Sequence, residues 1–139
     1  MDGRAFFVSA RLLMRKPSEV NRRSAISRGF FAVLNEARVA LERWGFAVVT
    51  TTDIDEIVIS HFDRVLNFEA IRVADVLTRL RNNRQIADYD LAGPGSFADV
   101  REVRHLLQLA QVGIDVLDQL EADPVQRAAT VAAICAALP

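Results

Sequence analysis

Apolar residues recur every three or four positions along most of the chain, which is the spacing of one face of an α-helix. The longest such run lies between Ser18, a residue type that often precedes a helix, and Gly45, a residue type that often follows one. It carries, in order, Ile26, Phe30, Val33, Ala37, Leu41 and Trp44. At about 1.5 Å per residue, this run predicts a helix roughly 40 Å long that can form the spine of a bundle.

Boundary residues divide the rest of the chain into further helices. A first helix is expected over about residues 4–15, before Pro17. The later helices are expected to begin, in chain order, at Thr52 or Asp53, at Asn67, between Ser96 and Asp99, and at Asp123–Pro124. Residues 46–52 (FAVVTTT) favour a strand by composition, but no second strand-like run exists to pair with them, so we expect an extended connection. The sequence therefore predicts an all-α, antiparallel bundle of five to six helices in a single domain that covers residues 1–139.

The expected last helix is unusually apolar. Its sequence VQRAATVAAICAAL, residues 125–138, contains one charged residue, Arg127. We expect the rest of the bundle or another subunit to cover it. Cys135 lies within this helix and is expected to be a small buried side chain, since a single cysteine cannot form an internal disulfide.

Composition places the chain among ordinary folded domains. Of its 139 residues, 51% are hydrophobic and 25% are charged, and the net charge of −1 gives no overall reason to bind nucleic acid or an anionic membrane. No run approaches the roughly 18 apolar residues of a membrane-spanning helix, and the N-terminal residues do not resemble a signal peptide, so we expect no membrane association and a cytoplasmic location. Two histidines and one cysteine do not favour a metal site, and no motif requires a cofactor.

Positive charge is nevertheless concentrated between residues 11 and 28. This stretch contains six cations, five of them arginines, and a single acid. Arginine offers several donors in one plane, which suits phosphate oxygens. Arg28, at the end of the stretch, is therefore a candidate contact to RNA or to a nucleotide.

The helical pattern breaks in the expected fourth helix. Its apolar stripe passes through Leu77 and Leu80, and the next turn of the stripe falls at Asn83 or Arg84. A guanidinium is costly inside a protein core unless it is paired and hydrogen-bonded, so its position on the stripe indicates a cleft or a subunit boundary. The alternative is that the bundle ends near Leu80 and that Arg84 forms a weak, solvated pair with Asp88, four residues later.

Several segments resemble one branch of the HEPN superfamily. The segment RQIADYD, residues 84–90, resembles the RxxADYD signature of that branch. Residues 21–46 (NRRSAISRGFFAVLNEARVALERWGF) are similar to its long helix, and residues 59–66 (ISHFDRVL) are similar to its short third helix. Residues 97–120 match its next helix in placement. Together these segments cover nearly the whole chain in the order of the family.

The resemblance implies an antiparallel helical homodimer that handles RNA or a nucleotide, with a minimal nucleotidyltransferase as its partner in a toxin–antitoxin pair. It implies Arg84 and Tyr89 as the catalytic residues, with Arg84 stabilising charge on a phosphate and Tyr89 stacking on a base or donating a hydrogen bond. The further residues expected to bind RNA or a nucleotide are Arg81, Asn82, Asn83, Arg28 and Asp88.

Departures from the family pattern leave two functions open. The ribonucleases of the family carry a histidine four to six residues after the motif arginine, but no histidine follows Arg81 or Arg84 at that spacing, and Tyr89 stands there instead. Tyrosine, with a pKa of about 10, is a poor general base at neutral pH. Packing or surface roles are expected for His61 and His105. The chain is either an RNA- or nucleotide-handling protein, a metal-independent endoribonuclease if it is an enzyme, or a non-catalytic module for dimerisation or protein interaction.

Overall fold

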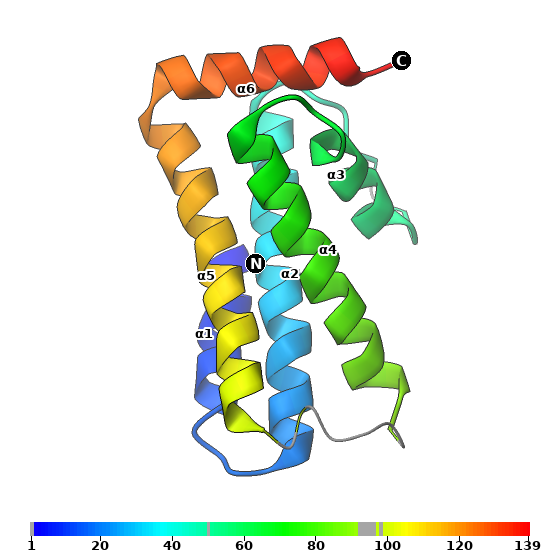
Figure 1. Cartoon of the computed structure of the whole chain (residues 1–139), viewed down its shortest axis with the longest axis vertical. Coiled ribbons are helices and arrows are strands. Elements are labelled where there is room, and N and C mark those ends of the chain that lie inside the picture. Colours follow the sequence, from blue (N-terminus) through cyan, green and yellow to red (C-terminus); the bar gives the residue numbers. More distant parts are fainter. Residues whose placement is uncertain (1, 50, 92–96, 98) are drawn as a thin grey trace.

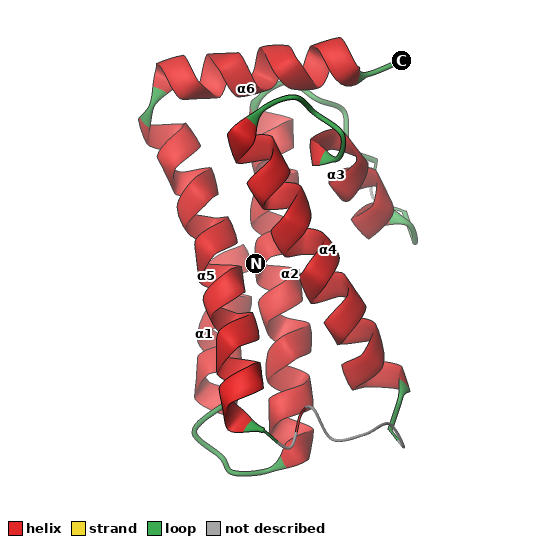
Figure 2. Ribbon diagram, viewed as in Figure 1, coloured by secondary structure: helices red, strands yellow, loops and turns green. Residues whose placement is uncertain are grey.

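Six helices make up the part of the chain that this computed structural model describes, which is residues 2–49, 51–91, 97 and 99–139. In chain order they are α1 (Gly3–Leu13), α2 (Glu19–Arg43), α3 (Ile54–Phe62), α4 (Phe68–Tyr89), α5 (Val100–Ala122) and α6 (Pro124–Ala137). In Figure 1, α2 and α5 run upwards and α4 runs downwards, so α4 is antiparallel to both of the other long helices. Figure 2 shows helices and loops and no strand over the described residues. The predicted all-α, antiparallel bundle is confirmed.

Three of the predicted helix starts are set by side chains that accept hydrogen bonds from free backbone N–H groups. The Ser18 hydroxyl accepts from the N–H of Asn21 at 3.1 Å, and the Asn67 side chain accepts from the N–H of Ala70 at 3.0 Å. Asp123 accepts from the N–H groups two and three residues later, at 3.0 and 3.1 Å. Local side-chain chemistry therefore fixes where α2, α4 and α6 begin.

Two further helices begin after predicted residues, Asp53 and Asp99, and the end of the first helix differs from the prediction. Asp53 precedes α3, but its side chain makes no capping hydrogen bond. α5 begins at Val100, where the Asp99 side chain accepts from the N–H two residues later at 2.9 Å. Ser96, the other expected start of that helix, lies outside the described residues. α1 ends at Leu13, two residues before the expected end, and the chain then turns into α2.

The main core lies where α2, α4 and α5 pack together. Its largest fully buried side chains include Phe30, Phe62, Ile26, Leu41, Leu77, Leu80, Leu120 and Ile134. Gly113 of α5 lies between the two other helices, where a Cβ atom would be 3.0 Å from methyl carbons of both Val33 and Val76. Each large apolar side chain contributes about 1.5–3 kcal/mol on full burial, so this three-helix contact carries most of the fold's hydrophobic stabilisation.

α6 lies across one end of the bundle, as Figure 1 shows. The Thr130 hydroxyl donates to the Asn67 side chain at 3.1 Å, and within α6 Thr130 and Ile134 are the buried residues. The bundle thus covers one side of the helix, because α6 crosses the ends of its neighbours instead of lying along them. The prediction that Cys135 is buried is wrong, since its side chain is exposed.

A small polar cluster attaches the N-terminus of α1 to α2 and α5. Arg4 donates to Asp118 of α5 and lies 3.8 Å from Glu36 of α2. Gly3 lies against the same glutamate, since a Cβ atom there would be 2.9 Å from its Oε1. Burial, together with a hydrogen bond shared with Asp2, raises the pKa of Glu36 above its ordinary value, and the charge of Arg4 opposes that rise.

We expect the raised pKa of Glu36 to cost stability as the pH rises toward neutrality. A carboxyl whose pKa is higher in the folded state contributes fully below its ordinary value of 4.5, and that contribution is lost as the pH rises through the folded-state value. Glu36→Gln removes this titration, so the variant should gain in melting temperature relative to the native chain as the pH increases above 4.5. Thermal unfolding of both proteins over a pH series measures this difference, and a constant difference contradicts the prediction.

Candidate functional site

Arg84 lies near the C-terminal end of α4 and faces α2, and 21% of its side chain is exposed. Its guanidinium carbon is 5.2 Å from the ring centre of Phe31, 6.0 Å from that of Phe30 and 5.7 Å from that of Tyr89. Its Nε lies 2.9 Å from Oδ2 of Asp88. Each contact between a cation and an aromatic face contributes about 0.5–2 kcal/mol. The rings and the carboxylate together therefore hold the guanidinium at the edge of the core.

Asp88 connects this group to α2. The hydroxyl of Ser27 donates to Asp88 Oδ2 at 3.4 Å, and the same oxygen faces Arg84. The ion pair that the alternative interpretation expected is present, but its two side chains are 21% and 28% exposed and are therefore mostly enclosed. On an open helix surface, solvent screening reduces the contribution of such a pair to about 0.3–0.5 kcal/mol. The screening is weaker here because both side chains are mostly enclosed. Arg84 therefore keeps a fixed position, and the carboxylate of Asp88 partly offsets its positive charge.

Arg28 joins the same surface through two aromatic rings. Phe31 packs on Phe6 of α1, with ring centres 6.0 Å apart, and the guanidinium carbon of Arg28 lies 5.6 Å from the ring centre of Phe6. Successive contacts therefore link two arginines and three aromatic rings in the order Arg28, Phe6, Phe31, Arg84, Tyr89, which we call the aromatic–arginine row. Tyr89 ends the row with 73% of its surface exposed.

α4 separates the other predicted residues into two groups. Arg81 precedes Arg84 by one turn and lies on the same side of the helix. Asn82 and Asn83 instead line a cleft toward α5, together with His105. Because successive helical residues point about 100° apart, the four residues 81–84 cannot all face one way. The structure therefore brings Arg28, Asp88 and Tyr89 together with Arg84, whereas the two asparagines line the cleft toward α5, and Asn82 also lines a hollow beside Tyr89.

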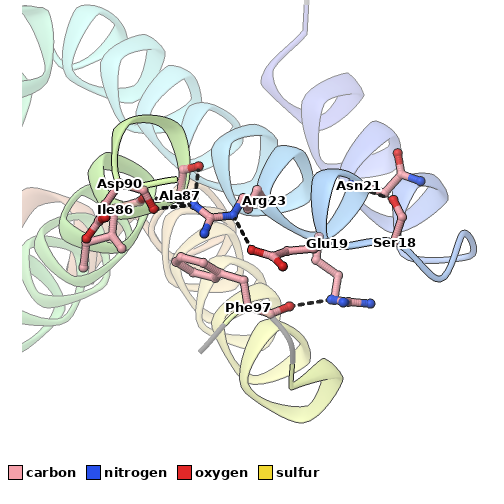
Figure 3. A network of polar contacts seen from close by, with 9 residues as sticks. Ser18, Glu19, Asn21, Arg23, Ile86, Ala87, Asp90 and Phe97 are labelled. Carbon is pink, nitrogen blue, oxygen red and sulfur yellow. Dashed lines mark hydrogen bonds and ion pairs between the residues drawn. The ribbon is translucent and has the colours of Figure 1, made fainter. Parts of the chain in front are cut away.

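A second arginine, Arg23 of α2, is buried, which the sequence pattern did not indicate. Arg23 is 8% exposed, and its NH1 donates to the backbone carbonyls of Ala87 at 3.1 Å and Asp90 at 2.9 Å. Its Nε donates to Glu19 at 2.9 Å, and its guanidinium carbon lies 4.9 Å from the ring centre of Phe97. Figure 3 shows this guanidinium between the end of α4 and the Phe97 ring. Arg23 therefore caps the carbonyls at the C-terminus of α4.

Two sequence features hint at this role, although neither is sufficient. Glu19 and Arg23 are four residues apart, which fits an ion pair on one helix face. The last turn of α4 has no basic residue of its own to neutralise its terminal carbonyls. The donor comes from α2, 63 to 67 residues earlier in the chain, so only the packing of the two helices identifies it.

Neither histidine supplies a base to Arg84 within the described residues. His61 packs edge-on against Phe46, with ring centres 5.7 Å apart, and its Nδ1 lies 2.7 Å from the carbonyl oxygen of Ile57. This is the packing role that the sequence predicted. His105 is exposed in the cleft between α4 and α5. The aromatic–arginine row can therefore bind planar and anionic groups, but it offers no imidazole for proton transfer.

The geometry defines the chain as an all-α bundle with a partly enclosed arginine on an aromatic surface. Comparisons with protein-family models, with curated proteins and with solved structures find no match. Over the described residues, no helix combines the length and apolar character needed to cross a bilayer, and no three acidic, histidine or cysteine side chains gather as metal ligands.

Proposed function

We propose that the chain is an HEPN-like protein that binds single-stranded RNA or a nucleotide through the aromatic–arginine row. Arg84, held between Phe31 and Tyr89, is the observation that supports this proposal most directly. Aromatic rings stack on bases with about 1–3 kcal/mol per base, independently of sequence. Arginine adds a planar group for stacking and donors for phosphate oxygens. A row that combines aromatic rings with arginines therefore suits an unpaired RNA strand.

The proposed activity is binding without cleavage. Cleavage that needs no metal requires a base to activate the 2′-hydroxyl as well as a cation to stabilise the phosphate. Arg84 fits the second role, whereas no histidine accompanies Arg84 among the described contacts. Purified protein mixed with labelled RNA in the presence of a chelator should leave the RNA intact, and the appearance of fragments would show an endoribonuclease.

The proposal includes a homodimer and, by resemblance, a minimal nucleotidyltransferase as partner in the cytoplasm. Ile86, Tyr89 and Leu91 are exposed apolar side chains near the C-terminal end of α4. A second copy that covers them would place a second Arg84 near the first and enlarge the surface available to RNA. Sedimentation equilibrium at micromolar protein should give the mass of a dimer, and the mass of a monomer would remove this part of the proposal.

The same exposed side chains favour a second candidate function, that of a non-catalytic module for protein interaction. In that case Ile86 and Leu91 bind the partner, and Arg84 serves to fix Tyr89. RNA binding by the native chain distinguishes the two functions, because only the first predicts it. Ile86→Ser should disrupt association in both, and it should reduce RNA binding only when that binding requires the dimer.

We expect Arg84→Ala to weaken the binding of single-stranded RNA by about tenfold, because it removes a phosphate contact and a stacking plane together. Fluorescence anisotropy with a labelled RNA measures the dissociation constant, and the loss should shrink as salt is raised. Arg84→Lys keeps the charge but loses the planar guanidinium, so its affinity for RNA should lie between that of Arg84→Ala and that of the native chain.

Arg101→Ala is the matched control for this experiment, because Arg101 is exposed on α5 and its loss changes the net charge equally. Circular dichroism on each variant verifies that the helices are retained. If Arg84→Ala and Arg101→Ala bind RNA with the same affinity, the aromatic–arginine row is not the binding surface.

A further inference from the structure

A second polar site lies on the side of α4 that faces α5, whereas Arg84 faces α2. It is a cleft of about 250 Å³ between α4 and α5. Asn82 and Asn83 line it from α4, Glu102 and His105 line it from α5, and the Phe97 ring forms part of its wall. Amide, carboxylate, imidazole and aromatic groups thus converge on one small volume that the proposed function does not use.

The wall of the cleft is held in place without a ligand. Phe97 is 2% exposed, and its ring lies under the guanidinium of Arg23. Its backbone carbonyl accepts a hydrogen bond from Nε of Arg22. The Asn83 side-chain amide donates to the backbone carbonyl of Arg79 at 2.8 Å, which leaves the Asn83 carbonyl oxygen as an acceptor. A site with fixed walls loses little entropy when a ligand is bound.

The charges of the cleft disfavour an anion. Arg79 lines the cleft, but its guanidinium lies 3.7 Å from the carboxylate of Asp75, one turn earlier on α4. Glu102 adds a second carboxylate on the α5 side. Two carboxylates therefore offset one guanidinium, so a free phosphate gains little here. A neutral base that donates hydrogen bonds is favoured, and the phosphate of a nucleotide bound through its base must stay in solvent.

We propose that this cleft binds a single nucleobase that carries an exocyclic amine, adenine or cytosine. Asparagine amides pair with the edge of adenine, and a glutamate accepts from the amine of cytosine. The exposed ring of His105 provides a face for a planar heterocycle, while the buried Phe97 ring closes the apolar base of the cleft. The volume is smaller than the roughly 300 Å³ at which sites for larger organic ligands begin, which suits one base. Uracil, which carries a carbonyl oxygen in place of the amine, faces the carboxylate of Glu102 unfavourably.

This inference does not rest on RNA binding by the aromatic–arginine row, since none of the residues that line the cleft belongs to the row. The test is a nuclear magnetic resonance titration of the ¹⁵N-labelled chain with AMP, CMP, UMP and inorganic phosphate. We expect AMP and CMP at millimolar concentration to shift the side-chain amide signals of Asn82 and Asn83. We expect UMP to bind about tenfold more weakly, the cost of one mismatched donor–acceptor contact, and phosphate to cause no shift.

Glu102→Gln and His105→Ala should each weaken AMP binding by about fivefold or more, because each removes one group that touches the base. Both residues are exposed, so these variants keep the core intact. Arg104→Ala is the matched control, because Arg104 lines a separate hollow with Phe7 and Arg11. Equal shifts with UMP or phosphate, or shifts that persist in both cleft variants, overturn the proposal.

A short oligoadenylate distinguishes the two sources of such a base. Binding no tighter than that of AMP identifies a site for a free nucleotide, and tighter binding identifies a site for one base of a strand. In Arg84→Ala, AMP should bind as it does to the native chain. Loss of RNA binding in Arg84→Ala with unchanged AMP binding would show that the two sites act independently. Loss of AMP binding in the same variant would contradict that independence.

Discussion

Replacement of Arg23 by alanine should lower the free energy of unfolding by about 3 kcal/mol, the range measured when one partner of a buried charged network is removed. The side chain donates to the carbonyls of Ala87 and Asp90 and to the carboxylate of Glu19, and it stacks on Phe97. Its loss leaves the last carbonyls of α4 without donors and opens a gap beside the ring. Chemical denaturation monitored by circular dichroism measures the change.

Two further variants separate the role of Arg23 from a general effect of charge. Arg23→Lys keeps the charge, but a single ammonium on a flexible stem cannot reach Glu19, Ala87 and Asp90 together, so about half of the loss should remain. Arg101→Ala, at an exposed site on α5, should change stability by less than about 0.5 kcal/mol. If Arg23→Ala behaves like Arg101→Ala, then Arg23 does not hold the end of α4.

Replacement of Gly113 by leucine should also destabilise the fold by about 3 kcal/mol, although helix propensity alone predicts a gain of nearly 1 kcal/mol. A Cβ atom at this position already lies 3.0 Å from methyl carbons of Val33 and Val76. The remaining side-chain carbons must push α5 away from α2 and α4, and overpacking of this kind costs about 1–3 kcal/mol or more. Thermal and chemical unfolding both measure this effect.

Gln108→Leu places the same side chain on the exposed face of the same helix, so it isolates helix propensity from packing. It should leave stability within about 0.5 kcal/mol of the native chain. A leucine at position 113 that is tolerated equally well would show that α5 does not approach α2 and α4 as closely as the structure indicates.

These two variants also show where prediction from sequence ends. The glycine in α5 looks unfavourable from propensity, and Arg23 looks like one of several cations in a basic stretch. Neither residue forms its decisive contacts within its own helix. Gly113 is needed because three helices meet there, and Arg23 is buried because the end of α4 and Phe97 lie beside α2.

Only part of the candidate site could be predicted from the sequence, because its other contacts also come from different helices. The position of Arg84 on an apolar stripe predicted a side chain that is neither in the core nor free in water, and its 21% exposure agrees with that prediction. The grouping of Arg84 with Asn82 and Asn83 could not be settled from their adjacency in sequence, because the helix turns about 100° per residue and sends them to different neighbours. The contact of Arg28 to the same surface depends on Phe6 of α1, which the sequence did not connect with it.

The sequence by itself determined the class of fold, the order of the helices and most of their boundaries, because helical periodicity and capping act over three or four residues. Ser18, Asn67 and Asp123 cap their helices through contacts of that range. Only the tertiary structure decided which arginine is buried, which side of α6 is covered and which groups share a cleft. Those outcomes depend on contacts between residues far apart in the chain, whose formation is governed by how whole helix faces pack against one another.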